Sequence, residues 1–285
     1  MTTEVAGWLR QLEQTGYCII PQLVPQAQIT ELADALETDF GQTPFSQGLF
    51  YGQRTKRFGR LLSRAPQSAA LVLQPEIIAL AQAVLGRACD RIQLNVAQAI
   101  EIHPGEPAQF PHRDEDMWAG VKGQHEYLLN VMWPLDPFTP DNGATCIYPG
   151  THRVQQQALD DLPEAMIATC LPGDVLCFLG STVHGAGANR TNSTRRAVVV
   201  GYSLGWLKPY ENPWLAYPPA VARHFPKALT DLVGYVQHRP NLGNFEGQCP
   251  SILLDGSPDL YPGAIDALRP NQEAMLAAYA GHGEA

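Results

Sequence analysis

Between residues 90 and 210 the chain is built from short segments rich in β-forming residues, and turns separate these segments. The segments are IQLNVAQAIEI, EYLLNVMWPLD, ATCIYPG, DVLCFLG and RRAVVVGYSLGW. The stretches between them, HPGEP, TPDNG, LPGD and NRTNST, hold the Pro, Gly, Asn and Asp residues that turns use. Because no helical pattern lies between the strands, they indicate an antiparallel sandwich or barrel rather than a parallel βαβ sheet.

Helical patterns lie on both sides of this β region. The N-terminal segment carries a helical stripe of apolar side chains, Pro25 is placed to open a helix, and Gly86 is placed to end one. The predicted helices span residues 3–15, 25–40, 75–86, about 214–237 and 270–280. We therefore predict one domain over residues 1–285, with a helical portion over 1–90, a β core over about 90–210 and a helical C-terminal tail.

Composition and charge exclude several classes of function. With 45% hydrophobic and 16% charged residues, the 285-residue chain has the composition of a globular protein. Its formal net charge of −9 speaks against a nucleic-acid or anionic-membrane surface, because both need a positive field. The sequence shows no bilayer-spanning apolar stretch, no signal-peptide pattern and no CxxC pair among its six cysteines. We therefore expect a cytoplasmic protein with reduced thiols.

The stretch FPHRDEDMW places one histidine and three carboxylates in five consecutive positions. In a strand, side chains at i and i+2 share a face, so Asp114 and Asp116 would point the same way as His112. Arg113 and Glu115 would point to the opposite face. A neutral imidazole with a carboxylate two residues later supplies two neighbouring ligands for a divalent metal. Strand alternation excludes Glu115 but leaves both aspartates as the second ligand.

A further candidate ligand, His184, lies far downstream in DVLCFLGSTVHGAGANRTNSTRR. A lone histidine is a weak signal, but Gly185 and Gly187 beside it would let another group approach closely. Two histidines and one carboxylate on an antiparallel barrel match the facial triad of non-haem Fe(II) enzymes, which leaves three metal positions open. The pattern therefore indicates a metal site suited to oxygen chemistry, although the same ligands also suit zinc.

Five longer stretches, which span most of residues 50–214, follow one another in a familiar order. They are FYGQRTKRFGRLLSR, HPGEPAQFPHRDEDMW, LLNVMWPLDPFTPDNGATCIYPGTHR, LPGDVLCFLGSTVHGAGANRTNSTRR and GYSLGWLKPYENPW. Together they resemble the phytanoyl-CoA dioxygenase family of Fe(II)/2-oxoglutarate-dependent oxygenases. The resemblance implies a mainly β fold with flanking helices, a double-stranded β-helix or distorted, cupin-like jelly roll, which agrees with the strand pattern.

The resemblance also implies roles for individual residues. It places the iron ligands on His112, Asp114 and His184, and so selects Asp114 over Asp116. Arg195, eleven residues after the distal histidine, falls on the position that anchors the distal carboxylate of 2-oxoglutarate. A guanidinium suits this task because it can bind a carboxylate bidentately in a fixed plane.

Several further residues are assigned less directly than the three iron ligands and Arg195. If residues 195 and 196 lie in a strand, Arg196 should face the side opposite Arg195. Arg54 would reach 2-oxoglutarate from the helical cap. The candidates for additional contacts with 2-oxoglutarate are Gln109, Thr145 and Arg54. The candidates for the substrate pocket or its rim are Trp118, Tyr127, Phe138 and Asp116.

The implied reaction is the oxidation of a small molecule with Fe(II), 2-oxoglutarate and O2. Oxidative decarboxylation of 2-oxoglutarate gives succinate, CO2 and a ferryl species, and hydroxylation is the default outcome. An acyl-CoA substrate is an alternative, but only the run from Arg54 to Arg64 offers positive charge for its phosphates. We therefore predict a small, largely apolar metabolite. A zinc-dependent hydrolase or lyase and a non-catalytic binding protein are further alternatives, and neither accounts for Arg195 beside the three ligands.

Overall fold

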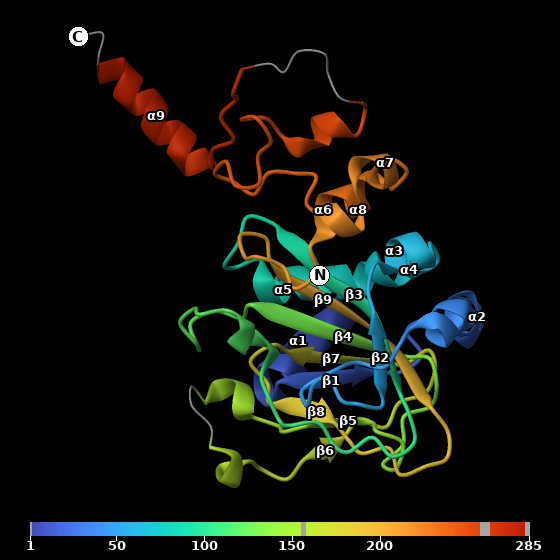
Figure 1. Ribbon diagram of the computed structural model, residues 1–285. Coiled ribbons are helices and arrows are strands. Elements are labelled where there is room, and N and C mark those ends of the chain that lie inside the picture. The colour runs from blue at the N-terminus through green and yellow to red at the C-terminus, as the bar shows by residue number, and fades with distance from the viewer. Residues whose placement is uncertain (1, 155–157, 257–262, 283–285) are drawn as a thin grey trace.

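Six antiparallel strands form the larger of two sheets and lie at the centre of the molecule (Figure 1). The computed structural model describes residues 2–154, 158–256 and 263–282. In spatial order the strands are β1 (Tyr17–Ile20), β7 (Val175–Leu179), β4 (Leu128–Pro134), β9 (Arg195–Leu204), β3 (Ile92–Ile102) and β2 (Thr55–Phe58). Apart from β2 and β3, strands that are neighbours in this sheet are not consecutive in the chain, which is the connectivity of a jelly roll rather than of a simple meander.

A smaller antiparallel sheet packs beside the larger one (Figure 1). Its strands are β6 (Met166–Ile167), β5 (Thr145–Ile147) and β8 (His184–Ala186). Side chains from both sheets line a common pocket, so the two sheets face each other across it. The strand-rich segments predicted between residues 90 and 210 all lie in these sheets, and the predicted antiparallel sandwich is confirmed.

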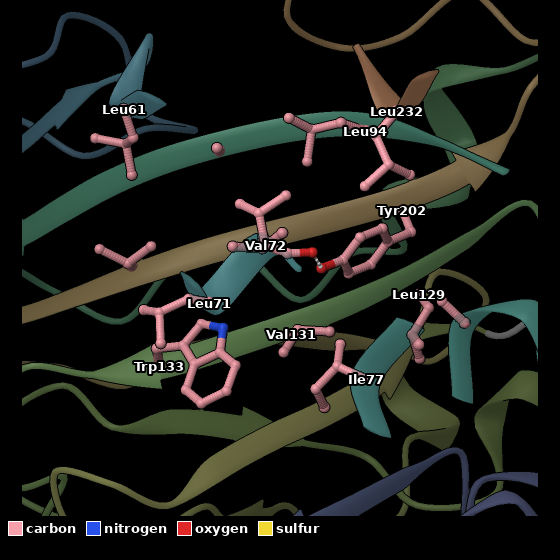
Figure 2. Packing of buried hydrophobic residues seen from close by; sticks show 14 of the residues in the cluster. Leu61, Leu71, Val72, Ile77, Leu94, Leu129, Val131, Trp133, Tyr202 and Leu232 are labelled. Atoms are coloured by element: carbon pink, nitrogen blue, oxygen red, sulfur yellow. Dashed lines mark hydrogen bonds between the residues drawn. The ribbon is translucent and has the colours of Figure 1, made fainter. Parts of the chain in front are cut away.

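Helices cover the face of the larger sheet that is turned away from the pocket. They are α1 (Thr3–Thr15), α2 (Gln26–Gln42), α3 (Leu61–Arg64), α4 (Ser68–Val72) and α5 (Pro75–Leu85). Their apolar stripes and the sheet form one buried cluster. Figure 2 shows Val131 and Trp133 of β4 packed among Leu71 and Ile77 of these helices. Burial of such apolar surface is the main stabilising contribution, at roughly 25 cal/mol for each Å².

The longer N-terminal helices form where the sequence predicts them, because their signals are local. The α1 helix begins after Thr2, whose hydroxyl accepts a hydrogen bond from the Val5 amide, and ends at Gly16, where φ is 87°. Pro25 directly precedes α2, and α5 ends at Leu85, just before Gly86. Part of the basic run differs from the prediction, because Thr55–Phe58 forms the strand β2 rather than part of a helical cap.

The C-terminal tail is less regular than predicted. Three short helices replace one long pattern, because prolines at their starts interrupt it: α6 (Pro213–Ala216), α7 (Pro219–Ala222) and α8 (Lys227–Leu232). The α9 helix (Pro270–His282) extends away from both sheets (Figure 1). Short 3-10 turns complete the fold: η1 (Asp114–Met117), η2 (Thr151–Arg153), η3 (Leu159–Asp161) and η4 (Pro250–Leu253). Among the helices of the described residues, none is both long and apolar enough to cross a membrane.

Candidate active site

The main candidate site is the pocket between the two sheets. Strand β4 alternates across the larger sheet, so that Asn130 and its i±2 neighbours face the pocket while the residues between them face the helices. The rest of the pocket is lined by side chains from other strands, including Thr145 of β5, His184 of β8 and Arg195 of β9. Residues far apart in sequence therefore meet here because of the strand order.

Three candidate metal ligands meet in this pocket. The backbones of His112 and His184 form a bridge, in which each N–H donates to the carbonyl of the other at 2.9 Å. The Asp114 carboxylate lies between the rings, with Oδ1 3.4 Å from Nε2 of His112 and Oδ2 3.5 Å from Nε2 of His184. One ligand atom from each residue lies within 4.8 Å of the other two. A single divalent metal can therefore bind all three side chains.

Gly185 lets the two segments that carry the histidines approach each other. A Cβ atom at this position would lie 3.0 Å from the carbonyl oxygen of Gln109, which is closer than side chains normally tolerate. The amide of Gln109 also donates to the carbonyl of Ala186 at 2.9 Å. We expected another group to come close to the chain beside His184, and this group is the backbone of the segment that leads to His112.

The backbone around Asp114 differs from the predicted strand. His112 makes one β-bridge, and the 3-10 turn η1 begins two residues later at Asp114. The strict alternation of a strand therefore does not apply here. Glu115 is buried, whereas Asp116 is exposed and lies 3.6 Å from the Lys122 ammonium. Asp116 is consequently not part of the pocket wall, and Asp114 is the aspartate that reaches the histidines.

Hydrogen bonds orient both histidine rings in the pocket. Nδ1 of His112 lies 2.8 Å from the Phe110 carbonyl, and Nδ1 of His184 lies 3.1 Å from the Thr182 carbonyl. Each Nδ1 therefore carries the proton, and each Nε2 has a free lone pair. Burial lowers the pKa of His184 to about 4. Burial alone would raise the pKa of Asp114, but the neighbouring histidines and a side-chain amide hold it at about 2.

Arg195 is a buried cation in the pocket wall. It begins β9, is 1% exposed, and its Cζ lies 4.3 Å from the ring centroid of Phe138. It donates to the Gly143 carbonyl, while its Nε has no hydrogen-bond partner within the described parts of the chain. Burial lowers the pKa of Arg195 to about 9. Arg196 faces the other side of the strand, as alternation predicts, and pairs with carboxylates on α2 and β3.

Two of the three further residues predicted to contact 2-oxoglutarate line the pocket, namely Gln109 and Thr145. Arg54 does not. Its side chain is exposed in the loop before β2, and its Nε donates to the Pro104 carbonyl at 2.6 Å. The β2 strand, which was expected to be part of a helical cap, directs Arg57 into the pocket instead.

Arg57 is the charged pocket residue that the sequence prediction missed. Its Cζ lies 5.4 Å from the ring centroid of Tyr51, and its Nη1 lies 3.4 Å from Oε1 of Gln98. Its Nε has no hydrogen-bond partner among the residues that the structure describes. Burial lowers the pKa of Arg57. Reading TKRF as a strand would have placed Arg57 and Lys56 on opposite faces, but it would not have shown which of the two faces the pocket.

The aromatic residues predicted for the substrate pocket lie elsewhere. Trp118 and Tyr127 pack edge to face with ring centroids 6.3 Å apart, and their polar atoms donate to backbone carbonyls. Phe138 lies behind the guanidinium of Arg195. The mouth of the pocket is lined by other large, partly exposed side chains, which are Phe50, Tyr51, Met117 and Tyr210.

A jelly roll with a His-Asp-His cluster between its sheets is the arrangement of the non-haem iron oxygenases. The sequence profile of the Phytanoyl-CoA dioxygenase (PhyH) family matches residues 12–197, which is more than half of the chain. The chain therefore belongs to the phytanoyl-CoA dioxygenase family, and it is an oxidoreductase of the dioxygenase class. The family and the fold class predicted from the sequence are both confirmed.

Known dioxygenases are similar over most of the chain. Dioxygenase FrzG from Cladobotryum sp is 34% identical over 226 residues, which cover 74% of this chain and 70% of FrzG. Dioxygenase aneA from Aspergillus aculeatus is 30% identical over 222 residues, which cover 72% and 74%. The epimerase SnoN, solved in complex with Fe3+, alpha ketoglutarate and nogalamycin RO, has the same fold. Its TM-score is 0.60 at 16% identity, over 94% of this chain and 96% of SnoN.

Proposed function

We propose that this dioxygenase uses Fe(II) and 2-oxoglutarate and binds iron through His112, Asp114 and His184. The observation that carries the proposal is the convergence of two imidazoles and one carboxylate within 4.8 Å. Two nitrogens and one oxygen suit Fe(II) and leave three positions open. Iron bound there would supply the oxygen chemistry that amino-acid side chains lack, and the protein would supply placement and exclusion of water.

The two arginines that line the pocket, Arg195 and Arg57, match the two carboxylates of 2-oxoglutarate. Arg195 is assigned to the distal carboxylate, because it lines the pocket and its guanidinium is fixed against Phe138. Its Nε has no hydrogen-bond partner among the described residues and could donate to that carboxylate. Arg57, whose charge interacts with that of Asp114, is assigned to the carboxylate nearer the metal. Gln109 connects two segments at the mouth of the pocket, because its Nε2 donates a hydrogen bond to the Phe50 carbonyl at 3.0 Å.

The substrate is proposed to be a small, largely apolar metabolite, and hydroxylation is the proposed outcome. The mouth offers aromatic and thioether surface, and its polar atoms are the phenols of Tyr51 and Tyr210, whose oxygens lie 2.5 Å apart. Such a surface binds an apolar molecule that carries few polar groups. SnoN, which shares the fold, was solved with the small molecule nogalamycin RO.

An acyl-CoA substrate fits the surface less well. Its phosphates would need exposed cations near the mouth, and three of the five cations of the basic run are engaged or turned inward. Lys56 pairs with Glu101 at 3.3 Å, Arg64 pairs with Asp39, and Arg57 is turned into the pocket. Only Arg54 and Arg60 of this run stay exposed without an ion pair among the described residues, which favours the smaller substrate.

Anaerobic titration with Fe(II) and then 2-oxoglutarate tests the proposal. The wild-type protein should develop a visible metal-to-ligand charge-transfer band. Asp114→Ala should lose both the band and succinate formation, because one of the three ligands is gone. Glu115→Gln is the matched control, since it changes the adjacent, buried carboxylate without changing its volume, and it should retain the band. A wild-type protein that gives no band and holds zinc tightly would overturn the oxygenase proposal.

A further inference from the structure

Asn130 is a polar side chain in the middle of the apolar strand LLNVMWP. It is 2% exposed, and its Nδ2 donates a hydrogen bond to Oδ2 of Asp114 at 2.9 Å. Its partners across the sheet are Phe178 on β7 and Gly201 on β9. A buried amide in such surroundings costs free energy unless it is hydrogen-bonded, so packing alone gives no reason for an asparagine here.

Each candidate metal ligand has one partner that orients it. The two histidines donate from Nδ1 to the carbonyls of Phe110 and Thr182. Asp114 accepts from Asn130. The first two partners are main-chain atoms and survive any side-chain substitution. Among these three partners, only the one that orients Asp114 is a side chain, and it comes from a different strand.

We propose that Asn130 is a positioning residue that makes Asp114 bind iron through a single oxygen. The inference rests on the proposed iron site. The amide engages Oδ2 and fixes the plane of the carboxylate, which leaves Oδ1 to bind the metal. A carboxylate that bound through both oxygens would take one of the positions that 2-oxoglutarate and O2 need.

A role in packing alone leads to a different expectation. Leucine has the same branching and the same number of side-chain heavy atoms as asparagine, although it is bulkier, and it prefers apolar surroundings. If Asn130 only fills space, Asn130→Leu would therefore leave the metal site unchanged. If Asn130 orients Asp114, the same substitution frees the carboxylate to rotate. Metal affinity and the metal spectrum therefore separate the two roles, whereas stability does not.

The experiment is an anaerobic titration of the full chain with Co(II), followed by Fe(II) with 2-oxoglutarate. Asn130→Leu should weaken Co(II) binding about 10- to 100-fold, the usual effect of losing an outer partner of a metal ligand. Its Co(II) absorption spectrum should also shift. Asn95→Leu is the matched control. Asn95 is another buried asparagine of the pocket wall, but it accepts from the Tyr210 amide, and its variant should keep wild-type Co(II) affinity.

Wild-type Co(II) affinity and spectrum in Asn130→Leu would overturn this proposal, even if the wild-type protein forms the charge-transfer band. An equal loss in Asn95→Leu would overturn it as well. A protein that binds Co(II) but never forms the 2-oxoglutarate band contradicts the proposed function, and the comparison of affinities still decides the role of Asn130. If Asn130→Leu does not fold by circular dichroism, Asn130→Ser answers the same question, because its hydroxyl is too short to reach Asp114.

Discussion

At the residue scale, three positions separate an arginine in the pocket from an arginine in solvent. Arg54 precedes β2 and bonds to the Pro104 carbonyl, whereas Arg57 lies within β2 opposite Ile100, another pocket residue. Strand geometry, rather than the density of positive charge, decides which of them meets a ligand. The two residues therefore form a natural pair for testing which cation binds 2-oxoglutarate.

We expect Arg57→Gln to raise the KM for 2-oxoglutarate about 10- to 100-fold. The change removes a charged hydrogen-bond donor from a half-buried position in the pocket, which costs about 1.5–3 kcal/mol. Arg54→Gln should leave the KM at its wild-type value. Steady-state succinate release at varied 2-oxoglutarate measures both. Equal effects of the two substitutions would show that the assignment of Arg57 is wrong.

The candidate ligands could be named from the sequence because their signals are short. A histidine followed by nearby aspartates, and a histidine beside glycines, are visible without knowing the fold, and the family resemblance then selects Asp114 over Asp116. Arg57 and Asn130 could not be found this way, because their importance depends on which strands pair and which face of the sheet the pocket occupies. The pocket aromatics Trp118, Tyr127 and Phe138 were misplaced for the same reason.

At the scale of elements, the side chain of Tyr202 joins a strand to a helix end. Tyr202 lies on β9, is fully buried, and donates its hydroxyl to the carbonyl of Val72 at 2.7 Å (Figure 2). Val72 is the last residue of α4, where carbonyls have no partner within the helix. The hydroxyl therefore satisfies a carbonyl that would otherwise be buried without a hydrogen bond.

Tyr202→Phe should lower the free energy of unfolding by about 1–2 kcal/mol, because it leaves that buried carbonyl unsatisfied. Urea denaturation of the metal-free protein measures the change. Tyr279→Phe is the control, since Tyr279 is 80% exposed on α9, and it should have no measurable effect. If both substitutions cost the same, the hydrogen bond between β9 and α4 contributes nothing to stability. Because Tyr202 faces the helices, the KM for 2-oxoglutarate should stay unchanged in either variant.

At the scale of the whole molecule, the local elements and the fold class could be predicted, but the strand order could not. Helix signals and alternating strands act over a few residues, whereas the pairing of β3 with β9 joins segments about a hundred residues apart. Prolines divided the tail into short helices, and the polar residues after His112 formed a turn instead of a strand. The prediction of one domain over residues 1–285 stays a prediction.

The pH dependence of overall stability depends in part on Glu126, a half-buried carboxyl that does not line the pocket. Burial raises its pKa from 4.5 to about 7, although the hydroxyl of Ser181 donates to it. Below pH 4.5 the carboxyl is protonated in the folded and the unfolded chain. Between pH 4.5 and 7 only the unfolded chain loses the proton, so stability falls as pH rises, and the loss is complete above pH 7.

Glu126→Gln should remove this loss, because glutamine keeps an acceptor for Ser181 and never ionises. The difference in free energy of unfolding between Glu126→Gln and wild type should therefore favour the variant by about 1–2 kcal/mol more at pH 8 than at pH 5. This is less than the full pKa shift implies, because the carboxyl is only half-buried. Urea denaturation at both pH values measures the difference. Glu164→Gln, at an exposed carboxylate, should show no such dependence. A difference that stays constant or reverses between the two pH values would mean that Glu126 ionises freely in the folded protein.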